Sequence, residues 1–309
     1  MLRDKNAFFL DGGRLVLLLA SRCDAKGVIE AVAAKTLLPE LELLLSKRPA
    51  PLAAAIRRVV TDLRPCVRLE TTRAGVDPLR GSLLTGLFGR PPAAPVLPPT
   101  ASKFGSVPYI ESAGELAGGR FIGQINFAEA AAALNQADFP IPEGMPNAGL
   151  LAVDLTPGHF SGRVRWYPQP HESNAVHPGA IDTVAKYETR IQFRGSWSLR
   201  GLGWFDDVPK DDHELWNYMN DLEIPGVDED ARGGHKLFGH PNEALNEHYG
   251  LDPVPGRSDS IRDYGLIWRI NYDNPAGFSW GTNWLYVVIH VEDLMQGALE
   301  HAVVTGANA

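Results

Sequence analysis

The chain has 309 residues, of which 44% are hydrophobic and 21% are charged; this composition is typical of a globular protein and excludes wholesale disorder. Its two cysteines exclude a disulfide scaffold and are typical of a reducing compartment, so we expect a soluble, cytoplasmic protein. The net charge of −8 divides into +6 for residues 1–90 and −14 for the remainder, which indicates either surfaces with different partners or two solvated faces.

Residues 1–74 are predicted to form an N-terminal helical segment with one strand. Apolar residues recur at three- and four-residue spacing within residues 25–64, which favours short helices. The stretch CVRLE at residues 66–70 alternates apolar and charged residues, as a half-buried strand does. The apolar run before them is interrupted at residues 11–14, so we expect no signal peptide, and no stretch approaches the length of a membrane span.

Residues 75–101 are rich in proline and glycine and are predicted to be a linker. From there to residue 309 the pattern predicts short strands separated by turns. The expected strands are 106–110, 120–126, 149–155, 163–168, 186–193, 235–239, 265–271 and 284–290. Helices are expected at 127–136, 211–222 and 291–301.

Two parts of this domain have similar sequences. SKFGSVPYI, RFIGQINFAEA and GLLAVDL in the first part correspond in order to HKLFGHPN, GLIWRINYD and WLYVVIHVEDL in the second. We interpret them as pseudo-repeats at about 102–195 and 235–301, although short strand patterns also recur by chance. The predicted fold class is therefore α+β, with duplicated, mainly antiparallel sheet units, flanking helices and the N-terminal helical segment.

The motifs SKFGSVPYI, RFIGQINFAE, GGHKLFGHP and WGTNWLYVVI, with a proline-rich approach to Gly149, occur in an order that resembles the YwqG-like family over residues 66–301. The chain departs from the family pattern at Ser106, at His240, in NEALNEH and at residues 282–283. The resemblance implies a duplicated α+β fold and no particular reaction. It also implies a candidate small-ligand site, made of Lys103, Gln124, Asn126, Lys236 and Trp280. Because some members lie among toxin–immunity genes, it implies protein binding.

The sequence contains no recognised catalytic motif. The best metal candidates are His235, His240 and His248, with Glu243 and Glu247 between them, although their spacing matches no standard site. Asp211, Asp212 and Glu214 beside His213 form the densest acidic group, which could perform acid–base hydrolysis only within a pocket. We therefore predict no cofactor and leave the enzyme question open.

The most unusual segment, residues 206–230, holds ten acidic residues and a single basic one, Lys210. An outward acidic surface repels nucleic acid and attracts basic proteins. Tryptophans at its edges could anchor an interface, although a solvated loop explains the same composition. The predicted partner-binding residues are Asp206, Asp207, Asp211, Asp212, Glu214, Trp204 and Trp216.

These observations predict an immunity-type, protein-binding inhibitor. It would neutralise a basic partner, such as a cognate toxin or another enzyme, by occluding the partner's active site through an acidic surface. We expect neither nucleic acid nor a membrane as a partner. The alternative is a metal-dependent hydrolase or a small-ligand-binding protein.

Overall fold

A computed structural model describes residues 64–74, 97–116, 118–157, 161–177, 181–198, 234–240, 263–279 and 283–308, and the single positions 46, 50, 53, 54, 57 and 159. The strands with described bounds are β1 (Arg64–Arg73), β2 (Lys103–Phe104), β3 (Arg120–Asn126), β4 (Leu150–Leu155), β5 (Gly162–Tyr167), β6 (Thr189–Ser198), β7 (His235–Leu237), β8 (Tyr264–Ile270), β9 (Asn283–His290) and β10 (Val303–Asn308). The α-helices are α5 (Phe127–Gln136) and α7 (Val291–Gln296), and the 3-10 helices are η2 (Ala113–Leu116), η3 (Glu172–Asn174) and η8 (Leu299–His301).

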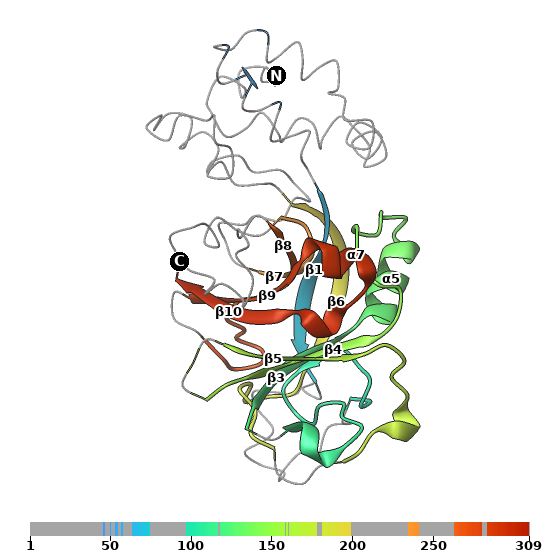
Figure 1. The fold of residues 1–309 in the computed structure, drawn as a ribbon, viewed down its shortest axis with the longest axis vertical. Helices are drawn as coiled ribbons and strands as arrows, with labels where there is room; N and C mark the ends of the chain where they lie inside the picture. The colour runs from blue at the N-terminus through green and yellow to red at the C-terminus, as the bar shows by residue number, and fades with distance from the viewer. Residues whose placement is uncertain are drawn as a thin grey trace, which may run out of the picture.

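The ten described strands close into a barrel (Figure 1). Their order around it is β1, β6, β2, β3, β4, β5, β10, β9, β8 and β7, and every pair of named strands is antiparallel. The ring is completed by β1 pairing with β7 and by β5 pairing with β10, which join strands distant in the sequence.

The predicted α+β class, with duplicated, mainly antiparallel sheet units and flanking helices, is therefore wrong, because the described strands form one closed barrel. The period-two alternation that identifies a strand is the same in an open sheet and in a closed barrel, because both have one buried face. The predicted N-terminal helical segment lies almost entirely outside the described residues, as does the helix expected at 211–222.

The barrel interior is the hydrophobic core, and the strands reach it by alternation. Along β9, Leu285, Val287 and Ile289 belong to the main core cluster, whereas Tyr286 and Val288 belong to a smaller cluster. Successive side chains of a strand point to opposite faces, so the small cluster lies on the outer face. Part of the barrel wall is therefore covered by apolar residues on both sides.

Helix α5 begins at Asn126, whose side-chain oxygen accepts a hydrogen bond from the backbone N–H of Ala128 and so caps the first turn. One face of the helix, with Phe127, Ala130 and Leu134, joins the main core cluster. Helix α7 follows β9 directly and ends at Gly297, which has left-handed backbone angles. Within the described residues, no helix has the length and apolar character needed to span a membrane.

The pairs β2–β3 and β7–β8 share a local geometry. Lys103 lies opposite Gln124, and Lys236 lies opposite Arg269. The longer strand of each pair has a register shift against its other neighbour, between Phe121 and Gly123 where β3 pairs with β4 and between Leu266 and Trp268 where β8 pairs with β9. Two successive left-handed residues follow each short strand, residues 105–106 and 238–239. The two halves of the barrel therefore use the same construction here, while the pseudo-repeats themselves stay a prediction.

Candidate functional site

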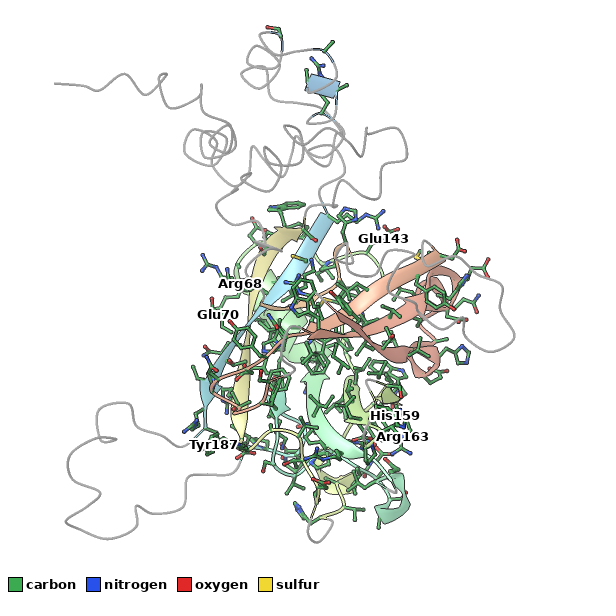
Figure 2. The ribbon with its side chains drawn as sticks, turned by 90° about the vertical axis from the view of Figure 1, so that its left-hand side faces the viewer. Arg68, Glu70, Glu143, His159, Arg163 and Tyr187 are labelled. Carbon is green, nitrogen blue, oxygen red and sulfur yellow. The ribbon has the colours of Figure 1, made fainter. Side chains whose placement is uncertain are left out.

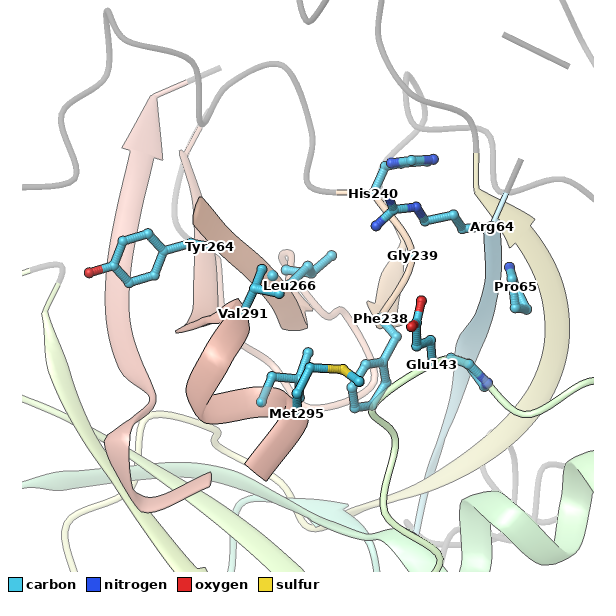
Figure 3. Close-up of a pocket in the computed structure, with 13 residues that line it drawn as sticks. Arg64, Pro65, Glu143, Phe238, Gly239, His240, Tyr264, Leu266, Val291 and Met295 are labelled. Atoms are coloured by element: carbon cyan, nitrogen blue, oxygen red, sulfur yellow. The ribbon is translucent and has the colours of Figure 1, made fainter. Parts of the chain in front are cut away.

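A surface hollow of about 330 Å³ lies where the ends of β7 and β8 meet α7 (Figure 3). Its lining comes from five separate segments: the start of β1, the loop before β4, the end of β7, the start of β8, and helix α7. The lining residues are Arg64, Pro65, Pro142, Glu143, Phe238, Gly239, His240, Tyr264, Gly265, Leu266, Val291, Leu294 and Met295. This is the candidate functional site, and we call it the hollow.

The floor of the hollow is apolar and partly strained. Phe238 and Leu266 are almost fully buried there, with exposed fractions of 2% and 1%. Phe238 has a φ of 58°, a left-handed conformation that costs a residue with a side chain about 1–2 kcal/mol. At the equivalent place in the other half of the barrel, Gly105 takes that conformation without this penalty, and a Cβ there would lie 2.8 Å from the carbonyl oxygen of Tyr187. Strained backbone of this kind gathers at functional sites.

The rim of the hollow exposes apolar and charged side chains side by side. Val291 and Met295, on helix α7, are 43% and 61% exposed, although both are large apolar residues. Arg64 and Glu143 are also exposed on the rim, and they carry opposite charges. Met295 and Phe238, both labelled in Figure 3, line the same hollow. An apolar floor with a mixed rim can accept one or two apolar side chains or a small apolar ligand.

Except for His240, the hollow contains none of the predicted site residues. Its lining comes from segments far apart in the sequence, so no local motif marks it. One signal was available, since VEDLM places apolar Val291 and Met295 four residues apart, on one face of a helix. That pattern predicts a helix with an apolar stripe, and it does not indicate that the stripe is exposed.

His235 belongs to a buried polar network at β7. Its Nδ1 accepts a hydrogen bond from the backbone N–H of Asn271 at 3.1 Å, so the ring proton is on Nε2, which donates to Asp273 Oδ2 at 3.0 Å. Thr71 Oγ1 donates to the same carboxylate oxygen at 2.6 Å. In a nucleophilic triad the hydroxyl group donates its hydrogen bond to the imidazole, whereas here the Thr71 hydroxyl donates to the carboxylate. The network therefore ties β1, β7 and the turn after β8 together.

Acidification below pH 6.5 is expected to weaken the fold through His235. Burial lowers the pKa of this imidazole below its ordinary 6.5, and Asp273 opposes the shift without cancelling it. The unfolded chain then takes up a proton near pH 6.5 while the folded chain resists, so stability is lost as the pH falls. Asp273 stays ionised in this range, because hydrogen bonds from His235 and Thr71 outweigh the effect of burial and lower its pKa below 3.8.

Urea unfolding at about pH 7 and about pH 5 measures this effect. The free-energy difference between wild type and His235→Asn should shrink at the lower pH. The exposed His159→Asn is the matched control and should follow the wild type. An equal pH dependence of wild type and His235→Asn would show that the buried imidazole of His235 does not cause the loss of stability at low pH.

The predicted metal ligands do not converge in the described part of the chain. Both ring nitrogens of His235 are engaged within the fold, and His240 lines the hollow with its backbone N–H donating to Ser198 Oγ at 3.1 Å. His248 lies outside the described residues, together with Glu243 and Glu247. Among the described residues, no group of three or more His, Cys, Asp and Glu could hold a metal ion.

The predicted small-ligand residues Lys103, Gln124 and Asn126 lie together, and all three bond to the segment just before β2. Gln124 Nε2 donates to the carbonyls of Pro99 and Ala101, and Asn126 Nδ2 donates to that of Thr100. Lys103 Nζ donates to the Pro98 carbonyl at 3.2 Å. These side chains hold the chain against the barrel wall. Lys236 is fully buried and donates to Ser198 Oγ at 3.1 Å, and Trp280 lies outside the described residues.

The predicted acidic contact surface lies outside the described residues. This applies to Asp206, Asp207, Asp211, Asp212, Glu214, Trp204 and Trp216, and also to His213. The segment that contains them connects two described positions, Ser198 at the end of β6 and Gly234 before β7. Its role in binding a partner stays a prediction.

Comparison with models of known protein families gives no match, and no curated protein matches the chain. The resemblance to the YwqG-like family therefore stays a prediction from the motifs alone.

Proposed function

We propose that the protein is a cytoplasmic, immunity-type binding protein that neutralises a partner protein by covering its active site. The observation that carries this proposal is the hollow, an apolar depression with exposed Val291 and Met295 on its rim. Protein interfaces concentrate their energy in a few anchor side chains that fill such depressions. Methionine suits a contact surface because its flexible side chain adapts to the shape of the partner.

In this proposal the partner inserts an apolar side chain against Phe238 and Leu266. Arg64 and Glu143 at the rim then bond to polar groups around the anchor, as the polar rim of an interface does. The acidic residues 206–230 would add attraction for a basic surface of the same partner. The cytoplasmic location is supported by the low cysteine content.

Replacing Met295 with aspartate is expected to abolish capture of the partner. The tagged wild-type protein is used as bait in its native cells, and mass spectrometry identifies the protein recovered near stoichiometrically. Met295→Asp places a charge at the anchor site and should lose that protein. Gln296→Asp makes a similar change at the next, exposed position of α7, outside the hollow, and should keep it. Retention of the partner by Met295→Asp would exclude the hollow as the contact.

The captured partner also tests the inhibitory role directly. Purified wild-type protein should suppress the partner's activity at an equimolar ratio, whereas Met295→Asp should not. A partner that binds through the hollow and keeps full activity would show that the protein binds without neutralising. The described residues offer no observation that favours the hydrolase alternative, which stays a prediction from the sequence.

A further inference from the structure

The outer faces of β1 and β6 form an exposed strip with a strong positive charge. The two strands pair without interruption over ten residue pairs, from Arg64 opposite Ser198 to Arg73 opposite Thr189. Their inward residues, Val67, Leu69 and Ile191, belong to the barrel core. The exposed residues of the outer face are Arg64, Arg68, Glu70 and Thr72 on β1 and Arg190, Gln192 and Arg194 on β6. We call this set the arginine strip, and Figure 2 shows Arg68 and Glu70 projecting from β1 away from the barrel.

The charges of the arginine strip are not balanced. Four arginines face one carboxylate, and Arg68 lies directly opposite Arg194. Like charges directly opposite on neighbouring strands destabilise a sheet. Within the described part of the chain, the carboxylate that pairs with a strip arginine is Glu70, which lies 3.9 Å from Arg194 Nη1 and is itself 53% exposed. The opposed arginines therefore slightly lower the stability of the unbound protein, and their guanidinium N–H groups can donate hydrogen bonds to an external anion.

The strip has a length and a chemistry suited to several anionic groups. Residues along a strand rise about 3.3 Å each, so Arg64 and Arg68 are about 13 Å apart. Arg190 and Arg194 have the same four-residue separation on the neighbouring strand. Arginine presents a planar fork of donors that binds carboxylates and phosphates in a bidentate manner. An extended acidic segment could therefore contact three positions along the strip.

The position of Glu70 favours a protein over a nucleic acid as the anion. Glu70 lies in the middle of the strip, where a continuous phosphate backbone would meet a negative charge. An acidic stretch of protein can avoid Glu70, because its charges are separated by neutral residues.

One residue of the strip also belongs to the hollow, while Cys66, Ser196 and Ser198, which lie between it and Arg68 on the outer face, are buried. Arg64 is the first residue of β1 and of the arginine strip, and it lines the rim of the hollow. We infer that the arginine strip binds an acidic segment of the partner protein, next to the apolar side chain that enters the hollow. This inference rests on the proposed function, and it adds the chemistry of the partner: an apolar anchor followed by carboxylates in an extended segment.

Binding of a fluorescein-labelled peptide of five Glu-Gly repeats, followed by fluorescence anisotropy at low salt, tests the strip alone. The wild-type protein should bind the peptide, and Arg68→Glu should weaken binding by about tenfold or more, because it places like charges in contact. Lys186→Glu makes the same charge reversal at an exposed residue outside the strip and should change binding less than about twofold. Arg68 is exposed, so its reversal should leave the fold intact, which circular dichroism verifies.

Three outcomes would overturn the inference. The first is equal peptide binding by wild type and Arg68→Glu, or no binding by either. The second is tighter, Arg68-dependent binding of a labelled 12-nucleotide single-stranded RNA, which would assign the strip to nucleic acid. The third is a low-salt dimer in sedimentation that Arg68→Glu abolishes, which would assign it to a second copy of the chain.

The peptide has no apolar side chain that could enter the hollow. Its binding therefore tests the arginine strip independently of the proposed function. Met295→Asp should bind the peptide as the wild type does, whatever happens to partner capture. The two experiments can also disagree: Met295→Asp can abolish capture of the partner while Arg68→Glu leaves peptide binding unchanged. That result would support the proposed function and exclude the arginine strip as the binding surface.

Discussion

The Arg165→Met variant is expected to lose about 3–5 kcal/mol of unfolding free energy, because it leaves a buried carboxylate without its main partner. Arg165 and Asp154 are 7% and 1% exposed on neighbouring strands. Arg165 Nε and Nη2 donate to the two carboxylate oxygens at 2.7 and 2.9 Å, and Nη1 donates to the Tyr109 carbonyl at 2.9 Å. Burial alone would lower the pKa of Arg165, but Asp154 outweighs it and the pKa is raised, so the guanidinium stays charged.

The neighbouring arginine provides a matched control. Arg163 Nη2 lies 3.3 Å from the same carboxylate, but its side chain is 47% exposed. Arg163→Met should therefore cost less than about 1 kcal/mol. The double variant Asp154→Leu/Arg165→Met should be more stable than Arg165→Met, because it leaves no buried charge unpaired. Urea denaturation followed by circular dichroism measures all of them, and equal losses for the two single variants would contradict the argument.

Local elements of this fold could be predicted where the chain itself carries the signal. The limits predicted for β3 and α5 are those of the structure, because RFIGQIN ends in an asparagine that also caps the helix. The limits of β4 and β9 differ from the prediction by one residue at the start only, and those of β5 and β8 by one residue at both ends. The strand expected at 106–110 is absent there; β2 ends at Phe104, and Ser106 has a φ of 60°, which a strand does not allow.

The closure of the barrel could not be predicted, because it depends on which strands pair with one another. The hydrophobic pattern of a single strand does not specify its neighbours. The strand β1 reads like any half-buried strand, and its pairing with β6 and β7 joins it to segments more than a hundred residues away. The strand β10 falls in the region after the predicted helix at 291–301, where VVTGAN is short and interrupted by glycine. Its position between β5 and β9 is set by the rest of the barrel.

The hollow could not be predicted from the sequence for a related reason. Lys103, Gln124 and Asn126 were predicted to bind a small ligand, and in the structure their polar atoms bond to one segment of the fold. The hollow has no motif, because its floor and rim come from five segments. These three polar side chains therefore have a structural role, and the exposed apolar residues that suit binding have a pattern that any amphipathic helix shares.

The second large effect concerns Lys103, whose buried charge is expected to destabilise the fold at neutral pH. Its side chain is 1% exposed, and Glu188, the carboxylate nearest to it among the described ion pairs, lies 3.9 Å away. Burial lowers the pKa of this ammonium from 10.5 to about 8, and Glu188 only partly opposes the shift. Between these two values the unfolded chain holds the proton and the folded chain has lost it, so raising the pH stabilises the fold. The shift corresponds to about 3 kcal/mol.

Comparison of wild type with Lys103→Met at two pH values isolates this contribution. Relative to the variant, the wild type should gain about 2–3 kcal/mol of unfolding free energy between about pH 7 and about pH 10. The exposed Lys186→Met controls for the loss of a lysine as such and should keep the wild-type pH dependence. At neutral pH, Lys103→Met should be at least as stable as the wild type, because methionine fills a similar volume without a charge to bury. A marked loss of stability at neutral pH would instead mean that the hydrogen bond to Pro98 outweighs the cost of burying the ammonium.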